Sequence, residues 1–179
     1  GGTISFSGGT LQFSVNNGFD YSSRFSTAAG QAISIDTAGQ TVRFATGLGS
    51  SGGTLAKTNS GTLILTGPSS YSGATTLSGG KLVFQGSKTG SGNITVADGA
   101  TLGIFDTGTQ VTPAILVLGT NAGVNIEFDS INSTTAAPLA AGSIASAGVT
   151  IININSGTFQ LGNSYPLLTW SGGSAPAVS

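Results

Sequence analysis

The fold of this chain is decided by residues 51–84, which read SGGTLAKTNSGTLILTGPSSYSGATTLSGGKLVF. Short segments of this stretch alternate apolar residues with Thr, Ser or Lys, and Gly-Gly or Ser-Gly pairs separate them. Alternation with a period of two places the apolar side chains on one face of a β-strand, and glycine permits the sharp turns between strands. The stretch therefore predicts short β-strands that are connected by glycine corners.

The same pattern continues on both sides of this stretch, for example at residues 32–35, 41–44, 93–96 and 101–104. Residues with a strong helix preference are scarce, since the chain has one Glu, three Lys and no Met. We expect an all-β protein with almost no α-helix.

Apolar strand residues recur at steps close to twenty. One series has steps of 21, 19 and 20 and consists of Val42, Leu63, Leu82 and Leu102. A second has steps of 22, 22, 17 and 21 and consists of Ile33, Leu55, Leu77, Ile94 and Ile115. Two interleaved series predict the coils of a parallel β-helix. A sandwich with a strand about every 8–12 residues is also compatible with this spacing.

The coils are expected to form a single domain. We expect a dry interior that is lined by the pairs Ile94/Val96, Leu102/Ile104, Ile115/Val117 and Ile126/Phe128. Residues 1–128 are interpreted as β-helix coils, residues 129–148 as an irregular loop or excursion that breaks the period, and residues 149–179 as terminal coils. Since the chain starts at Gly1 rather than Met, we interpret it as a mature product or an excerpt of a longer polypeptide.

Composition excludes several classes of function. The chain has 179 residues, of which 30 are Gly, five are Lys or Arg, six are Asp or Glu, and none is His, Cys or Met. Without His or Cys there is no Ser-His-Asp or Cys-His relay, no zinc site built on these ligands and no disulfide framework. A net charge of −1 does not support nucleic-acid binding. No run approaches the roughly 20 apolar residues of a membrane-spanning helix.

Residues 55–82 closely resemble the autotransporter-associated (passenger-associated) β-strand repeat of large bacterial surface proteins. The matching elements are Leu-x-Lys-Thr at 55–58, Ser-Gly-Thr-Leu at 60–63, Thr-Gly at 66–67, Tyr-Ser-Gly at 71–73, Thr-Thr-Leu at 75–77 and Gly-Gly-x-Leu at 79–82. The chain departs from the repeat at Asn59, Ala74 and Lys81, and none of these changes opposes a strand. The repeat itself is placed at about residues 54–85, and the flanks resemble the coils that accompany it.

This resemblance implies a right-handed parallel β-helix, an exported location on the outer surface or outside the cell, and a mainly structural role. We expect no enzymatic activity and no cofactor. We expect a stalk, fibre or adhesin scaffold. Its expected partners are neighbouring segments or further copies, which would pair through the strands near both termini. A surface polysaccharide or a receptor is a further candidate partner. The alternative is a carbohydrate-active module, either a lyase or hydrolase or a binding domain.

Carboxylates are the candidate catalytic residues of that alternative. Glu127 and Asp129 flank Phe128, so on a strand they share one face, where a pair of carboxyls could act as acid and base or bind a cation. No Lys or Arg lies nearby in sequence. Asp98 and Asp106 form a second candidate pair, although turn capping or a solvated strand edge explains such residues as well.

The remaining motifs have structural explanations too. Asp20, Asp98 and Asp106 could contribute to a calcium site, but they lack the dense spacing of calcium loops. Residues 47–52 match the dinucleotide pattern G-x-G-x-x-G, yet a strand and not a helix follows, which favours a corner. A sugar-stacking platform could be formed by Tyr21, Tyr71, Tyr165 and Trp170. Glycosylation-type triplets begin at Asn93 and Asn132 and are interpreted as incidental.

Overall fold

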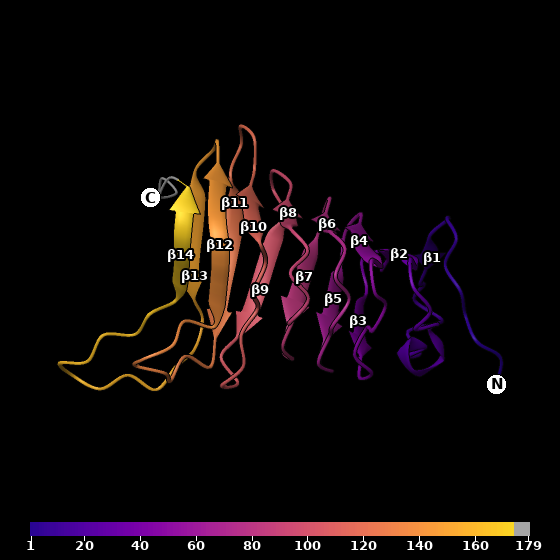
Figure 1. Ribbon diagram of the computed structural model, residues 1–179, viewed down its shortest axis with the longest axis horizontal. Helices are drawn as coiled ribbons and strands as arrows, with labels where there is room; N and C mark the ends of the chain where they lie inside the picture. Colours follow the sequence, from indigo (N-terminus) through magenta and orange to yellow (C-terminus); the bar gives the residue numbers. More distant parts are fainter. Residues whose placement is uncertain (174–179) are drawn as a thin grey trace.

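The chain is a β-solenoid. The computed structural model describes residues 1–173 and shows parallel strands wound about one axis in about seven turns, with almost no helix (Figure 1). The single helical element in the described residues is a short 3-10 turn, η1 (Ser22–Arg24). No helix in this described part is long and apolar enough to cross a membrane. The all-β solenoid that was expected from the sequence is confirmed.

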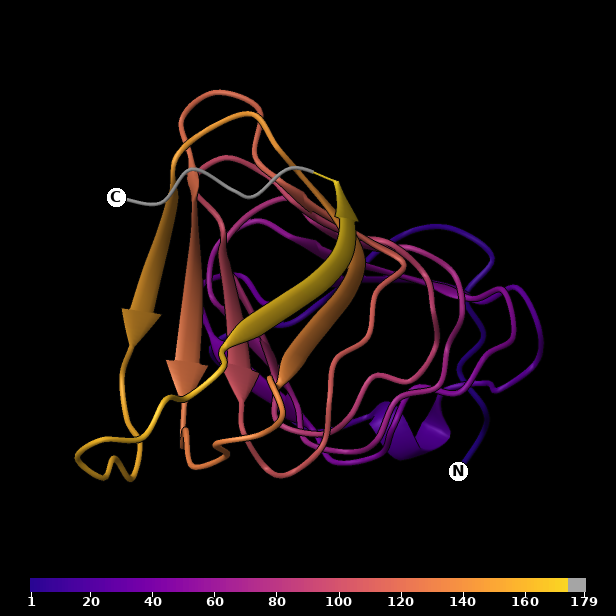
Figure 2. The ribbon, with the colours of Figure 1, turned by 60° about the vertical axis from the view of Figure 1, so that its left-hand side comes forward.

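Two parallel sheets form the long faces of the solenoid. The eight-stranded sheet runs in the order β1 (Leu11–Gln12), β2 (Ala32–Asp36), β4 (Thr54–Thr58), β6 (Thr75–Leu77), β8 (Ile94–Val96), β10 (Ile115–Leu118), β12 (Leu139–Ser146), β14 (Leu168–Gly173). The six-stranded sheet runs in the order β3 (Thr41–Phe44), β5 (Thr62–Leu65), β7 (Lys81–Phe84), β9 (Thr101–Phe105), β11 (Val124–Asp129), β13 (Thr150–Ile154). β1 pairs with β2, and from β2 onward each strand pairs with the strand two places along the chain. Figure 2 shows β9, β11 and β13 side by side and pointing the same way.

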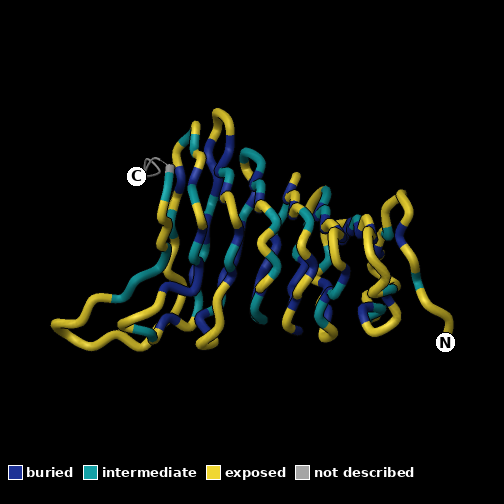
Figure 3. The backbone as a smooth tube through the Cα atoms, in the orientation of Figure 1, coloured by how far each residue is buried: buried dark blue, intermediate teal, exposed yellow. Residues whose placement is uncertain are grey.

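Equivalent residues of successive coils stack inside the solenoid. The first apolar series is one such column, because Val42, Leu63, Leu82 and Leu102 are direct register partners. All four side chains are fully buried, and the column continues to Ile126 in β11. Burying each large aliphatic side chain contributes about 1.5–3 kcal/mol relative to exposure. Figure 3 shows the buried positions along the strands of successive coils.

The second apolar series combines two columns and was wrong as a single stack. Leu55 pairs with Thr75 rather than Leu77, and Leu77 pairs with Val96 rather than Ile94. Each strand has two inward positions, i and i+2, so a step near twenty does not distinguish one column from the other. Thr75 holds its inward position because its hydroxyl bonds to the buried Tyr71 hydroxyl at 2.6 Å.

One of the four expected interior pairs was also wrong. The residues that face inward in β10 are Leu116 and Leu118, which are at most 1 % exposed, whereas Ile115 is 37 % exposed. All four residues of this strand are apolar, so the sequence does not alternate and does not indicate which two residues face inward. The pairs Ile94/Val96, Leu102/Ile104 and Ile126/Phe128 are fully buried as expected.

Residues 129–148 are not an irregular excursion throughout. Residues 139–146 form β12, which pairs in parallel with both β10 and β14, and Asp129 ends β11. Only residues 130–138 and a tight corner at 147–149 are connections. This strand could not be recognised from the sequence because its residues, LAAGSIAS, include few large apolar side chains.

The two kinds of corner differ in length. Connections from the eight-stranded to the six-stranded sheet are tight, and at one of them Gly61 has φ +86°. A Cβ on Gly61 would lie 2.6 Å from the Gln40 carbonyl oxygen, so this corner requires glycine. The first five return connections each have nine residues, namely 45–53, 66–74, 85–93, 106–114 and 130–138. The G-x-G-x-x-G segment at 47–52 lies in the first of them and leads into β4, as a corner should.

Candidate functional site

The outer face of the six-stranded sheet carries the one ion pair of the described residues. Lys81 Nζ in β7 lies 2.5 Å from Glu127 Oε2 in β11. The lysine side chain crosses the intervening strand β9 at Gly103, where an added Cβ would lie 3.3 Å from Lys81 Cε. Because Gly103 has no side chain, it leaves the space in which Lys81 reaches across β9 and connects β7 to β11.

The two neighbouring carboxylates share this face, as expected for residues that flank Phe128. Asn155 Nδ2 donates to Glu127 Oε2 at 3.0 Å and to Asp129 Oδ2 at 3.2 Å, and the Ser156 hydroxyl donates to Asp129 at 3.2 Å. Burial raises the pKa of Glu127, but the hydrogen bonds from Lys81 and Asn155 and the charge of Lys81 together lower it below its usual value. A general acid needs a raised pKa, so this geometry fits an ion pair better than acid–base chemistry.

The second candidate pair is not a pair in space. Asp98 follows β8 and Asp106 follows β9, so they lie at opposite ends of β9. The described residues contain no cluster of three or more His, Cys, Asp or Glu side chains that could hold a metal ion. Each aspartate instead accepts hydrogen bonds from the next coil.

These aspartates tie one coil to the following one. Asp98 accepts from the backbone and hydroxyl of Thr120, both at 2.8 Å, and these bonds lower the pKa of Asp98 to about 2. Asp106 accepts from the Ser133 amide at 3.0 Å, and Asp20 accepts from the Ala45 amide at 2.8 Å. A carboxylate that accepts several N–H bonds stabilises the corner it caps.

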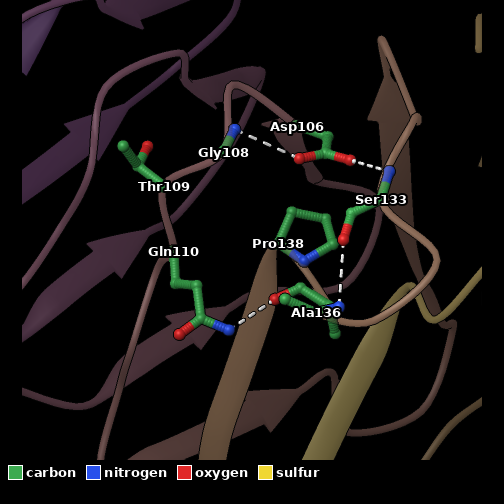
Figure 4. Close-up of a pocket in the computed structure, with 8 residues that line it drawn as sticks. Asp106, Gly108, Thr109, Gln110, Ser133, Ala136 and Pro138 are labelled. Carbon is green, nitrogen blue, oxygen red and sulfur yellow. Dashed lines mark hydrogen bonds between the residues drawn. The ribbon is translucent and has the colours of Figure 1, made fainter.

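A pocket of about 120 Å³ lies beside Asp106 (Figure 4). Several of its polar groups are already paired, because Gln110 Nε2 donates to the Ala137 carbonyl at 2.8 Å and the Ala136 amide donates to the Ser133 hydroxyl at 3.0 Å. The pocket therefore presents few free groups to a ligand.

Lys57 is fully buried, which sequence reasoning did not foresee. Its stem occupies the inward column between Ile35 and Leu77. Its ammonium donates to the carbonyls of Thr58 at 2.7 Å and Asn59 at 2.9 Å, with longer bonds to two more corner carbonyls. Burial lowers the pKa of Lys57, and the charge of a nearby aspartate opposes this shift. The sequence contained an indication of this burial, because Lys57 lies two residues after the inward Leu55 and therefore faces the same side of the strand.

Lys88 is a second fully buried lysine, and it forms no ion pair among the described residues. It sits between Ser69 and Val111 in a stack of bridge partners on the third side of the solenoid. Its ammonium donates to the Gly90 carbonyl and lies 4.7 Å from the ring centroid of Tyr71. Burial lowers the pKa of Lys88 to about 8. No pattern around this residue indicated burial.

The four aromatic residues do not form a platform. Tyr71 is 1 % exposed, and burial raises the pKa of its hydroxyl. Tyr21 packs against Phe13 and Phe19 near the N-terminal end. At the opposite end, Trp170 lies on β14 and Tyr165 lies in the connection before it, so no common exposed face joins all four. The first residues of the two glycosylation-type triplets lie in return connections, Asn93 before β8 and Asn132 after β11.

One of the comparisons with known proteins agrees with the resemblance seen in the sequence. Residues 55–84 match the family model of the passenger-associated-transport-repeat, which identifies this segment as an autotransporter passenger repeat. No curated protein and no solved structure matches the chain. The matched segment covers β4 to β7, in the middle of the two continuous sheets.

Proposed function

We propose that this chain, whose residues 55–84 are a passenger repeat, is a structural segment of the passenger of an exported protein. The observation that carries the proposal is the position of the repeat. The coils before and after it pair with it in the same parallel register, so the repeat is one part of a continuous rod. In the proposed role, the coils serve as a stiff scaffold on the outer surface of the cell or outside it.

The buried contacts support a mechanical role. The stacked apolar columns and the aspartates that cap successive corners join one coil to the next, and the ammonium of Lys57, which is bound mainly within its own corner, also reaches the Gly79 carbonyl of the following coil at 3.5 Å. In a solenoid, stability is approximately the sum of such neighbour contacts, so every coil contributes to stiffness. The polar clusters outside the core are engaged in pairing within the chain, which favours a scaffold over a catalytic module.

Accessibility on intact cells tests this proposal. Intact cells that produce the protein are treated with a protease, and the fragments are identified by mass spectrometry. A scaffold on the outer surface yields cuts in the exposed connection at residues 155–167 while the coils at 32–129 stay whole. Protection of the entire chain until the cells are lysed would contradict an outer-surface location. Cuts distributed evenly through the coils would contradict a rigid rod.

The carbohydrate-active alternative is tested in parallel with acidic and neutral polysaccharides. The scaffold proposal expects no degradation by the wild-type protein. An activity that the substitution Asp129→Ala abolishes would favour the enzyme instead.

A further inference from the structure

A tight turn after β1 contains the one Asn-Gly dipeptide of the chain, at Asn17 and Gly18. Both residues are exposed, and two backbone hydrogen bonds of 3.0 and 3.4 Å join Asn17 to Ser14. A Cβ added to Gly18 would meet no heavy atom within 4 Å, apart from its chain neighbours. Water and hydroxide therefore reach the peptide bond between the two residues.

Two hydrogen-bond donors converge on the side-chain carbonyl of Asn17. The Tyr21 hydroxyl donates to Asn17 Oδ1 at 3.1 Å, and the Phe19 amide donates to the same oxygen at 3.4 Å. Because Phe19 is two residues beyond Asn17, the second bond folds the side chain back along the intervening Gly18 peptide. The side-chain carbonyl carbon of Asn17 is thus held beside the Gly18 amide nitrogen.

Two other asparagine side chains are held by their amide nitrogen instead. Asn59 Nδ2 donates to Asp36 Oδ2 at 2.8 Å, and Asn155 Nδ2 donates to two carboxylates. Each of them is followed by serine, whose side chain restricts the approach to its backbone nitrogen. Asn17 alone is followed by glycine, which imposes no such restriction.

We propose that Asn17 is a site of spontaneous deamidation, at which the chain acquires an additional carboxylate. The Gly18 amide nitrogen gives up its proton to hydroxide and attacks Asn17 Cγ, after which the Cγ–Nδ2 bond breaks and ammonia leaves. Water then opens the cyclic succinimide at either of its carbonyl carbons, so position 17 becomes aspartate or isoaspartate. In sum, the amide and one water give a carboxylate and an ammonium ion, and nothing is oxidised or reduced.

The two donors at Asn17 Oδ1 favour the attack by the Gly18 nitrogen. Negative charge develops on Oδ1 as the nitrogen adds to Cγ, and donors that are already in place stabilise such an oxyanion. The Tyr21 ring packs against Phe13 and Phe19, with centroids 6.2 and 5.2 Å away, and this packing fixes its hydroxyl. Tyr21 therefore accelerates the reaction in the folded chain.

The conversion changes the charge and the backbone of this turn. It adds one negative charge to a chain whose net charge is −1. An aspartate at position 17 keeps both donors, because hydrogen bonds to an ionised acceptor are stronger. An isoaspartate lengthens the main chain by one carbon atom and disrupts the pairing with Ser14. Since the reaction consumes only water, the modified form accumulates with the age of the chain, whether or not the chain is a scaffold.

Incubation of the purified full chain at mildly alkaline pH and physiological temperature tests the proposal. Peptide mapping by mass spectrometry follows the conversion of each asparagine amide to an acid, and methylation by a protein isoaspartate methyltransferase detects isoaspartate. The variants are Gly18→Ala and Tyr21→Phe. Tyr165→Phe is the matched control, because it removes a tyrosine hydroxyl that also binds within a connection, where it accepts from the Gln160 amide. Circular dichroism verifies that all three variants are folded.

The proposal expects Asn17 to be modified faster than any other asparagine of the folded chain. Gly18→Ala should slow this conversion at least about tenfold, and Tyr21→Phe should slow it about threefold to tenfold, because one stabilising hydrogen bond is lost. Tyr165→Phe should react as the wild type does. In urea the Tyr21→Phe effect should vanish, since the hydrogen bond requires the folded turn.

An intact Asn17 in the folded chain, over a period in which the urea-unfolded chain is fully modified there, would overturn the proposal. Faster conversion at another asparagine would do the same. Equal rates for folded wild type and Tyr21→Phe would overturn the role of the hydroxyl. Gly18→Ala changes one exposed residue, so its result does not depend on how Tyr21→Phe folds.

Discussion

Replacing the buried lysine at position 88 with methionine should change how the stability of the solenoid depends on pH. Lys88 is fully buried, and its ammonium has one carbonyl acceptor and the Tyr71 ring as partners. Burial lowers the pKa of Lys88 to about 8, against 10.5 for an ordinary lysine. The folded chain therefore holds fewer protons than the unfolded chain between these two values. Stability rises with pH wherever the unfolded state binds more protons, so it should increase through this window.

The size of the effect follows from the two pKa values. At 1.36 kcal/mol per pH unit the shift corresponds to about 3 kcal/mol, and we reduce this to about 2 kcal/mol because the bond to Gly90 is only partly buried. Up to about pH 9.5, roughly 1 kcal/mol of this gain should be measurable. Higher pH is avoided because burial raises the pKa of Tyr71, and ionisation of this tyrosine in the unfolded chain would then oppose the gain.

Urea denaturation of the wild-type protein and of Lys88→Met at about pH 7 and about pH 9.5 measures the difference. The lowered pKa of Lys57 gives both proteins the same background, so the difference between them isolates Lys88. The wild-type protein should gain about 1 kcal/mol more than the variant, and the variant should be no less stable at neutral pH. Equal gains in the two proteins would refute the argument that Lys88 is a buried charge without an anionic partner among the described residues.

Three further substitutions test the contacts between coils. Lys81→Met should raise the pKa of Glu127, as measured by NMR titration. It should also cost about 0.5–1 kcal/mol of stability above pH 5, because the lowered pKa adds stability only where Glu127 is ionised. An unchanged pKa of Glu127 would contradict the ion pair with Lys81. Asp98→Ala should speed hydrogen exchange at the Thr120 amide. The wild-type protein should lose stability as acid protonates Asp98 near its pKa of about 2, and the variant should lack this loss. Leu82→Ala should cost about 2–5 kcal/mol in urea denaturation because this side chain is fully buried in the central column, and a cost under about 1 kcal/mol would contradict the stacking.

The coil repeat could be predicted from the sequence wherever strands alternate cleanly. Val42, Leu63 and Leu82 stand among polar neighbours or beside corners, so their spacing gave the stack directly. Alternation fails in β10, where four apolar residues leave the inward pair undefined, and in β12, where small residues replace the large ones. Both failures occur because composition stops distinguishing the two faces of a strand.

The polar contacts were less predictable, because they join residues of different coils. Lys81 and Glu127 are 46 residues apart, and only the register of β7, β9 and β11 brings them together. The capping role of Asp98 was expected from the turn that follows it, but its partner Thr120 lies one coil further on. A lysine in a sequence is normally expected to be exposed to solvent. The burial of Lys88 therefore depends on its stacking between Ser69 and Val111, which occurs only after the chain has coiled.

The central claim is that successive turns lie directly above one another, and engineered disulfides test it most directly. The chain has no cysteine, and Thr76 in β6 is the register partner of Thr95 in β8, while Val117 lies one coil further along the same outward column. Neighbouring strands are about 4.8 Å apart, within the Cα range of a disulfide, whereas strands two coils apart are about twice that distance. Under mild oxidation, Thr76→Cys/Thr95→Cys should form an intramolecular disulfide and Thr76→Cys/Val117→Cys should not, as measured by intact mass and thiol labelling. Equal oxidation of both pairs, or oxidation of the second pair alone, would contradict the stacked solenoid.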